Sequence, residues 1–345
     1  MNNRLKIVAD MDIPFLKGVL EPYFEVVYVK GFQINSDIIR GASALLIRTR
    51  TKCDRNLLDG TQISIIASAT IGTDHIDTDY CKKAFIEVKN APGCNSYAVM
   101  QYVFTSLYTV AQQKQVNLKN KTFGVIGVGN VGSKVASLAE YLGMKVLRND
   151  PPRENNENHD KGYFCSLDRV LEESDIVTLH IPLNKTTDNF AGESFFSKLK
   201  NGAIFINASR GEIVDEVALI SNIERLKATI IDVWRNEPVI NKTLLEKADI
   251  ATPHIAGYSK QGKINGTVSI LHSIGEHFNI SELQKFYMEE DRVKLNFENK
   301  SEAEVSAMLN NIYDVSADNE SLKARPQDFE TLRSNYNYRR EFYVQ

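Results

Sequence analysis

Short apolar runs alternate with longer amphipathic stretches along most of this chain, and no other feature constrains the fold as strongly. A first series of runs comprises Lys6–Asp10, Ala44–Ile47 and Ile63–Ala67. A second series comprises 122–127, 145–147, 176–179, 203–206, 229–232 and 249–251. Runs that are nearly continuous in apolar character are typical of strands covered by helices on both faces. Because strands separated by helices form parallel sheets with right-handed crossovers, the sequence predicts an α/β fold with two Rossmann-like, doubly wound parallel-sheet domains.

The segments that flank the second series predict the domain boundaries. Residues 95–115 are expected to form one long helix that carries the chain into the second domain, and 257–278 a helix that returns it. We therefore expect a discontinuous first domain of 1–95 plus part of 259–280, a second domain of 96–258 and a C-terminal α+β extension of 281–345. The tail 328–345 is rich in Tyr, Phe and Arg, which are common at interfaces. That composition favours a docking segment over a frayed amphipathic helix.

Composition and charge exclude several functional classes. A net charge of −3 and a pI near 6.1 argue against a basic surface for nucleic acid. No apolar run approaches the roughly 20 residues that span a bilayer, and the first ten residues lack the apolar core of a signal peptide. The four cysteines are scattered, which favours reduced thiols in a cytoplasm, and no His/Cys cluster suggests a metal site. The expected protein is cytoplasmic, with no membrane or nucleic-acid partner.

A glycine motif, GVGNVG, joins the first run of the second series to the next amphipathic stretch. Gly127 permits a tight turn, Gly129 lets the backbone approach a pyrophosphate, and Gly132 allows close packing of helix and strand. The phosphates are expected over the amides of Asn130 and Val131 at the helix N-terminus. A glycine-rich turn without a ligand is the alternative, but the strand before the motif and the helix after it favour a dinucleotide site.

An acidic residue stands where the second strand of such a site ends. Asp150 lies 18 positions after Gly132, close to the spacing at which a carboxylate binds the adenosine ribose hydroxyls. Because that carboxylate repels the 2′-phosphate of NADP, the sequence favours NAD. Arg148 and Arg153 are the counterargument, since an arginine there accommodates the 2′-phosphate. A structural role for Asp150 in the turn before Pro151 is the alternative.

Three polar motifs follow three later runs of the second series. They are Asn207–Gly211 with Arg210, the Glu237–Pro238 pair, and Pro253–Gly257 with His254. Ligands bind beyond the carboxyl ends of strands in open α/β sheets, so these side chains are expected near one another. Each residue alone has a simpler explanation, namely a surface ion pair, a loop carboxylate or a cap. Their order behind a dinucleotide motif favours a catalytic set.

Together with GVGNVG, these motifs resemble the D-2-hydroxyacid dehydrogenase family, whose members use an arginine, a glutamate and a histidine. The resemblance implies that Arg210 clamps the substrate, His254 is the general base and Glu237 orients it. These roles suit the chemistry, because alcohol oxidation needs a base for the hydroxyl proton and a guanidinium holds a carboxylate through paired hydrogen bonds. For NAD, the resemblance also implies contacts from His180, Ile181, Asp232 and Gly257. For Asp232 an N-cap role is the alternative.

Further segments resemble those family members that oxidise C2 of 4-phospho-D-erythronate for pyridoxal phosphate synthesis and form homodimers through an added C-terminal domain. They are 46–51, 67–75, 90–95, 312–315 and 339–342. The first domain would then bind the substrate through Thr49 and Thr70. Tyr258, which directly follows the Pro253–Gly257 motif, would also contact the substrate. Arg48 would attract the phosphate, although a solvated basic edge is the alternative. A general D-2-hydroxyacid dehydrogenase acting on glycerate or phosphoglycerate, or a non-catalytic NAD-responsive protein of the same fold, are alternative functions.

Overall fold

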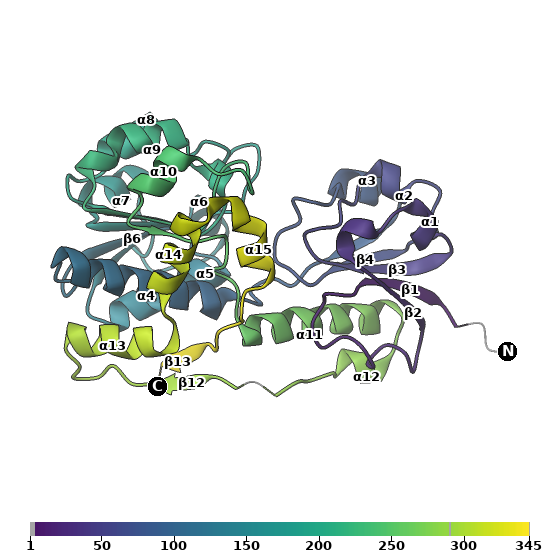
Figure 1. Cartoon of the computed structure of the whole chain (residues 1–345). Helices are drawn as coiled ribbons and strands as arrows, with labels where there is room; N and C mark the ends of the chain where they lie inside the picture. The colour runs from purple at the N-terminus through teal and green to yellow at the C-terminus, as the bar shows by residue number, and fades with distance from the viewer. Residues whose placement is uncertain (1–3, 290, 345) are drawn as a thin grey trace. The chain divides into compact units, whose positions relative to one another are not determined.

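The computed structural model describes residues 4–289 and 291–344, and the chain divides into two compact units (Figure 1). Met1–Asn95 with Lys260–Asp291 form the first unit, and Ser96–Ser259 with Arg292–Gln345 form the second. The extension expected at 281–345 is therefore not a compact unit of its own, because 281–291 belongs to the first unit and the rest to the second. Residues 1–3 and 345, which our expectations for the N-terminus and the tail included, lie outside the described residues.

The first unit is built on a parallel sheet of order β2-β1-β3-β4-β5, the flavodoxin-like arrangement. Its strands are β1 (Lys6–Asp10), β2 (Glu25–Val29), β3 (Ala42–Ile47), β4 (Ile65–Ser68) and β5 (Glu87–Lys89). Its helices are α1 (Ser36–Ile39), α2 (Arg55–Leu58), α3 (Thr78–Lys83), α11 (Lys260–His277) and α12 (Ser281–Gln284). Successive residues of β1 enter two different hydrophobic cores, Ile7 one and Val8 the other. Burial on both faces is the reason why these strands are continuously apolar.

The second unit contains a parallel sheet of order β11-β10-β9-β8-β6-β7. Its strands are β6 (Thr122–Ile126), β7 (Lys145–Asn149), β8 (Ile176–Leu179), β9 (Ile204–Asn207), β10 (Ala228–Ile231) and β11 (Ile250–Ala251). Its helices before the extension are α4 (Ser96–Lys114), α5 (Asn130–Tyr141), α6 (Pro151–Asn156), α7 (Leu167–Glu173), α8 (Glu193–Lys198), α9 (Glu216–Asn222) and α10 (Lys242–Lys247). The two parallel sheets confirm the predicted fold class. None of the described helices combines the length and the apolar character needed to cross a bilayer.

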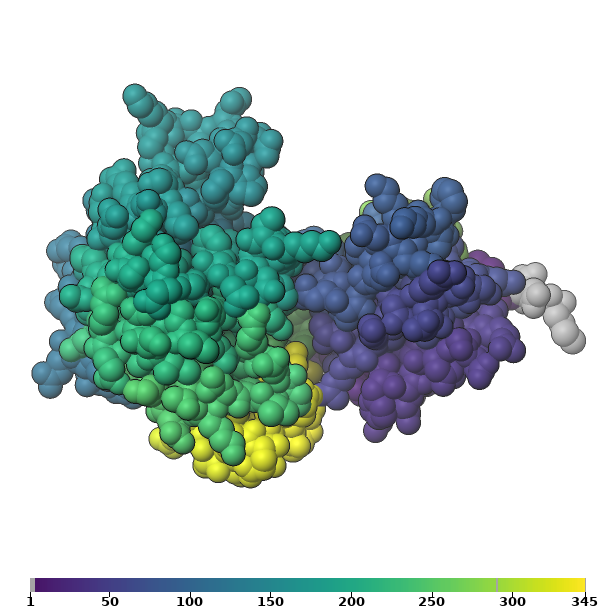
Figure 2. All heavy atoms as spheres, turned by 90° about the horizontal axis from the view of Figure 1, so that it is seen from above, coloured from purple at the N-terminus to yellow at the C-terminus, as the bar shows by residue number. Residues whose placement is uncertain are grey.

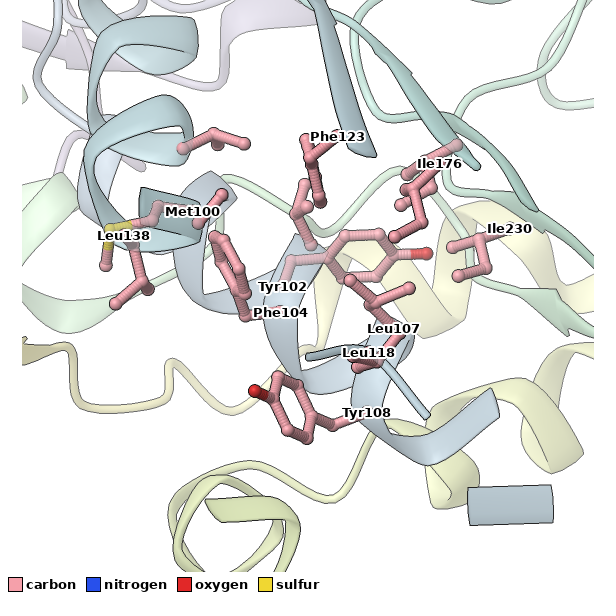
Figure 3. Close-up of a cluster of buried hydrophobic side chains, with 14 of the residues drawn as sticks. Met100, Tyr102, Phe104, Leu107, Tyr108, Leu118, Phe123, Leu138, Ile176 and Ile230 are labelled. Carbon is pink, nitrogen blue, oxygen red and sulfur yellow. The ribbon is translucent and has the colours of Figure 1, made fainter. Parts of the chain in front are cut away.

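Helix α4 lies in the core of the second unit, and its residues are buried almost all round. Figure 3 shows Tyr102 and Phe104 of this helix among side chains from the sheet, including Phe123, Ile176 and Ile230. The Tyr102 ring is fully buried. This packing joins the helix to strands β6, β8 and β10, whose carboxyl ends carry the residues discussed below.

The C-terminal extension packs against the second unit through α13 (Glu302–Ile312), α14 (Val315–Ala324) and α15 (Phe329–Ser334). A capping box of Ser301 and Glu304 begins α13. Strand β12 (Val293–Leu295) pairs in parallel with β13 (Phe342–Val344). Phe329 and Phe342 are fully buried, and Figure 2 shows the extension, in yellow, against the green surface of the same unit. The aromatic tail therefore docks on its own chain.

Candidate functional site

The glycine turn after β6 has the geometry that a pyrophosphate requires. Gly127 has a φ of +84°, and a Cβ there would lie 2.7 Å from the carbonyl carbon of His180. A Cβ on Gly132 would lie 1.9 Å from the carbonyl oxygen of Gly127, so the start of α5 touches the turn itself. A Cβ on Gly129, in contrast, would meet no atom within 4 Å. The open space at Gly129, next to the N-terminus of α5, fits a bound dinucleotide phosphate.

Asp150 connects this turn to the end of β7. Its carboxylate accepts hydrogen bonds from the amide of Val128, at 2.7 Å, and from the amide of Arg153, at 3.1 Å, where it caps α6. The guanidinium of Arg153 pairs with Glu157 at 2.6 Å. Arg148 likewise pairs with a carboxylate, that of Glu140, at 2.6 Å. Because a carboxylate already neutralises each arginine, the turn is better suited to a ribose hydroxyl than to a 2′-phosphate.

The loop after β9 presents Arg210 and is organised by Asn207. The side-chain oxygen of Asn207 accepts hydrogen bonds from the amide and hydroxyl of Ser209, and its amide group donates to the carbonyl of Arg210. Directly after the arginine, a Cβ on Gly211 would lie 2.0 Å from the carbonyl carbon of Trp234. The loops that follow β9 and β10 are therefore in direct backbone contact, which only a glycine permits.

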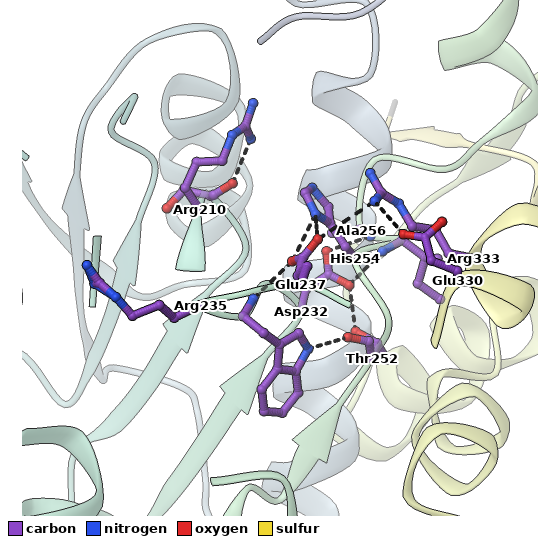
Figure 4. A network of polar contacts seen from close by, with 12 residues as sticks. Arg210, Asp232, Arg235, Glu237, Thr252, His254, Ala256, Glu330 and Arg333 are labelled. Carbon is purple, nitrogen blue, oxygen red and sulfur yellow. Dashed lines mark hydrogen bonds and ion pairs between the residues drawn. The ribbon is translucent and has the colours of Figure 1, made fainter. Parts of the chain in front are cut away.

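Glu237 and His254 form a partly buried hydrogen-bonded pair (Figure 4). The imidazole Nδ1 lies 2.8 Å from Oε2 and 3.1 Å from Oε1 of Glu237, and the Trp234 amide donates to Oε1 at 3.0 Å. Burial alone would raise the pKa of Glu237, but His254, the Trp234 amide and Arg333 outweigh burial and lower this pKa below its usual range. An ionised Glu237 accepts the Nδ1 proton, so Nε2 is the nitrogen available to take up another.

Arg210 lies apart from this pair. In Figure 4 the Glu237 carboxylate lies directly beneath the His254 ring, and the side chain of Arg210 lies to the left of both. Its Nη1 donates to the carbonyl of Ser209 at 2.8 Å. The three predicted catalytic residues thus follow neighbouring strands at one sheet edge, and the described contacts join two of them.

Asp232 underlies the His254 loop. Its buried carboxylate accepts hydrogen bonds from the hydroxyl of Thr252, at 2.6 Å, and from the amides of Ile255 and Ala256, at 2.8 and 2.9 Å. Burial raises the pKa of Asp232 in spite of these donors and of His254. His254 itself is in the left-handed region, with a φ of +57°. These contacts assign Asp232 a structural task, and its contact with the cofactor stays a prediction.

The loop after β8 packs against the glycine turn. The ring of His180 lies 3.1 Å from the hydroxyl of Thr178, and burial lowers the pKa of His180 to about 3. The imidazole is therefore neutral at physiological pH, which suits a position beside an uncharged adenine. The contacts predicted for His180, Ile181 and Gly257 with the cofactor stay predictions.

The predicted substrate residues of the first unit follow two neighbouring strands. Thr49 lies exposed beyond β3. Thr70 lies beyond β4, and its hydroxyl is 2.8 Å from that of Ser68, the last residue of this strand. Arg48 pairs with the buried Asp10 at 2.9 Å and with Asp12 at 2.8 Å. Two carboxylates thus hold its guanidinium, which weakens the hypothesis that Arg48 binds a phosphate.

Two residues near the site were not predicted from the sequence, and both come from the extension. Arg333 on α15 donates through Nε to the hydroxyl of Tyr258, at 3.1 Å, and lies 3.7 Å from Glu237. Arg339 is buried and donates to the carbonyls of Ile255 and Ala256, directly after His254. The sequence offered two signals, namely the arginine and tyrosine content of the tail and, for Arg339, the family resemblance of 339–342. Within the described residues, no group of three or more His, Cys, Asp or Glu residues is arranged to hold a metal ion.

Comparisons with known proteins agree on one family. The model of the D-isomer specific 2-hydroxyacid dehydrogenase NAD-binding domain matches residues 99–256. An erythronate-4-phosphate dehydrogenase of Bacteroides fragilis is 43% identical, over 98% of this chain and 97% of its own. One from Yersinia enterocolitica is 35% identical, over 98% of this chain and 93% of its own.

Solved structures agree with this assignment over a smaller part of the chain. The D-lactate dehydrogenase of Aquifex aeolicus, complexed with NAD and lactic acid, has a TM-score of 0.69 and 26% identity and covers 81% of this chain and 97% of its own. The NAD+-bound 3-phosphoglycerate dehydrogenase of Entamoeba histolytica has a TM-score of 0.69 and 27% identity, with 83% and 99% covered.

Proposed function

This chain belongs to the D-isomer specific 2-hydroxyacid dehydrogenases, and from that premise we propose that it oxidises 4-phospho-D-erythronate at C2 with NAD as the hydride acceptor. The product is 3-hydroxy-2-oxo-4-phosphooxybutanoate, which places the reaction in pyridoxal phosphate synthesis. The hydrogen-bonded Glu237–His254 pair carries the proposal, because it presents a base at the sheet edge that also carries the dinucleotide turn. The relatives named for this activity match nearly the whole chain.

The mechanism assigns one task to each residue of the site. The turn of Gly127, Gly129 and Gly132 would hold NAD, which would supply the hydride acceptor. Nε2 of His254 accepts the proton of the C2 hydroxyl as hydride leaves. Glu237 holds the ring through Nδ1 and stabilises the imidazolium that forms. Arg210 binds the substrate carboxylate or the C2 oxygen through paired hydrogen bonds.

Substrate choice rests on a small set of hydroxyl and charged groups. Tyr258, Thr49 and Thr70 offer hydroxyls to the substrate. Because Asp10 and Asp12 neutralise Arg48, we propose Arg48 only as a secondary phosphate contact. We also propose a homodimer and a cytoplasmic location, the first from the resemblance of the extension and the second from the scattered cysteines.

The test is turnover of the purified protein with three acids. 4-Phosphoerythronate, glycerate and 3-phosphoglycerate are each supplied with NAD, with and without a 2-oxo acid that reoxidises a tightly held cofactor, and products are followed by mass spectrometry. Of the three acids, we expect only 4-phosphoerythronate to be turned over. This turnover should be lost in His254→Ala, while NADH binding, measured by fluorescence, survives. Equal turnover of glycerate would favour a general dehydrogenase, and binding of NADH without turnover of any acid would favour an NAD-responsive protein.

A further inference from the structure

Arg333 reaches the candidate active site from a part of the chain that the dinucleotide-binding domain does not include. It lies on α15, whose first residue, Phe329, is fully buried in a hydrophobic core of the second unit. The core thereby holds the short helix in place. The side chain of Arg333 is 18% exposed, so its position is determined by packing and not by solvent.

The guanidinium approaches the carboxylate oxygen that orients the base. Its Nη1 lies 3.7 Å from Oε2 of Glu237, and this oxygen is also the one 2.8 Å from Nδ1 of His254. Figure 4 shows Arg333, Glu237 and His254 side by side, with Glu330 of the same helix against the far side of the arginine. A row of three charged or titratable groups, Arg333, Glu237 and His254, therefore runs from the extension to the base.

A second contact fixes the direction of a hydrogen bond. Nε of Arg333 donates to the hydroxyl oxygen of Tyr258 at 3.1 Å. Because a guanidinium has no acceptor, the tyrosine must accept here, and its own proton is directed elsewhere. Arg333 thus fixes the Tyr258 hydroxyl as the acceptor of this hydrogen bond and holds the ring in place.

We propose that Arg333 is a positioning residue for the dehydrogenase reaction, which holds the Glu237 carboxylate against His254 and fixes the orientation of the Tyr258 hydroxyl. The proposal rests on the function proposed above. Its electrostatic part follows from the row of charges, since a fixed positive charge beyond Glu237 opposes a second positive charge on the imidazole. The other charged groups described around His254 are Asp232 beneath its loop, Arg339 on the carbonyls of the two residues after it, and Arg210 on the neighbouring loop. Neither substitution below changes them.

The experiment compares Arg333→Gln, which removes the charge, with Arg333→Lys, which keeps it, and with a matched control. Arg325→Gln removes an equal charge from an exposed position in the same extension, just before α15. For Arg333→Gln we expect the acidic limb of the pH profile of kcat/KM to move up by about 0.5–1 pH unit, because two charges several Å apart near a protein surface interact on that scale. Arg333→Lys should keep the limb but raise KM about 3–10-fold, the usual effect of one lost hydrogen bond. Arg325→Gln should have the same acidic limb and the same KM as the unsubstituted protein.

A second measurement is independent of turnover. The imidazole resonance of His254, identified by its loss in His254→Gln, is titrated by NMR without substrate, and its midpoint should move upward in Arg333→Gln and not in Arg325→Gln. If the substrate assignment is wrong, no variant turns over 4-phosphoerythronate, yet this midpoint still moves. An unmoved midpoint in a folded Arg333→Gln, or an equal shift in Arg325→Gln, would overturn the proposal. If Arg333→Gln does not fold, a shifted limb or an unchanged KM in Arg333→Lys overturns it instead.

Discussion

Glu237 is the residue on which the proposed chemistry depends most, because its carboxylate has several partners at once. It accepts from the Trp234 amide and from His254, and Arg333 lies beside it. A half-buried carboxylate normally resists ionisation, and these partners reverse that tendency. The orientation of His254 and the charge that stabilises its protonated form therefore have a single source.

Replacing Glu237 with glutamine should remove the charge and keep the size. We expect kcat to fall by about 10²–10³-fold, because the imidazolium loses its counter-charge and the ring its preferred tautomer. Steady-state kinetics and a fluorescence titration with NADH measure the two effects separately. Since Glu237 does not contact the glycine turn, unchanged kcat or a parallel loss of NADH affinity would contradict this role.

The glycine turn offers a matched pair of substitutions. Gly129→Ala should leave thermal stability unchanged and weaken NADH binding by at least about tenfold, because its Cβ meets only the open space where a phosphate fits. Gly127→Ala should unfold at lower temperature, since its φ is +84° and its Cβ would meet the His180 carbonyl. Melting curves and NADH titrations of both variants test the distinction. Normal NADH affinity in Gly129→Ala would place the cofactor elsewhere.

Arg48 illustrates how a residue near a proposed substrate site can have a structural purpose. Arg48→Met should destabilise the protein by about 2–4 kcal/mol, because it strands the buried carboxylate of Asp10. The control Lys52→Met removes a cation whose side chain is 80% exposed, and it should cost less than about 1 kcal/mol. Urea unfolding measures both. A change in KM without a change in stability would restore Arg48 to a substrate role.

At the scale of elements, the C-terminal extension braces the loop that carries His254. Arg339 donates to the carbonyls of Ile255 and Ala256, whose amides in turn donate to Asp232 at the end of β10. Helix α14 packs against β11, the strand that precedes this loop. The loop is therefore held from below by the sheet and from the other side by the tail.

Helix α14 also carries a partly buried acid, Asp318, whose protonation should affect stability. Burial raises the pKa of Asp318 to about 6, although Tyr313 and Arg339 oppose the shift. Because the unfolded value is near 3.9, the stability that protonated Asp318 contributes is complete below about pH 4 and is lost as pH rises through 6, by about 2–3 kcal/mol. Asp318→Asn should not show this decrease in stability, because an asparagine side chain does not titrate. Urea unfolding at pH 4 and pH 7 should show that the free energy of unfolding of Asp318→Asn increases relative to that of the unsubstituted protein as pH rises. A difference in this free energy that is the same at both pH values would contradict the assignment.

At the scale of the whole molecule, the chain consists of two units that each have their own parallel sheet. The proposed reaction draws Arg210, Glu237, His254 and the dinucleotide turn from the second unit. It draws Thr49 and Thr70 from the first.

The proposed homodimer is tested by sedimentation. We expect a species of twice the 38.9 kDa of one chain, which persists on dilution through the range used for kinetics. The described extension already buries much of its aromatic surface on its own chain, so a dimer would use what is left exposed, such as Tyr343. A monomer that retains full activity would rule out a dimer as a requirement for catalysis.

Much of the fold was predictable because burial on both sheet faces demands continuous apolar runs. All nine runs fall within a residue or two of observed strands, and the helices predicted at 95–115 and 257–278 begin and end within three residues of α4 and α11. In the sheet of the first unit, β2 and β5 were not predicted; they lie at its edges and are only half-buried, so their sequences lack the signal. The short strands β12 and β13 of the extension were not predicted either. Turn, cap and strand-end chemistry are local, which is why the glycine motif, Glu237 and His254 could be singled out from sequence alone.

Only the tertiary structure decided which charges surround those residues. Arg333 contacts Tyr258 across 75 positions of sequence, and Arg339 reaches the His254 loop from a still greater separation. Arg48, which the sequence left open as a phosphate ligand, pairs with two carboxylates, Asp10 at the end of β1 and Asp12 just beyond it. No periodicity encodes such pairings, because they depend on where packing places the extension and the strand ends. The sequence determined the framework and the reacting groups, and the packing determined their electrostatic surroundings.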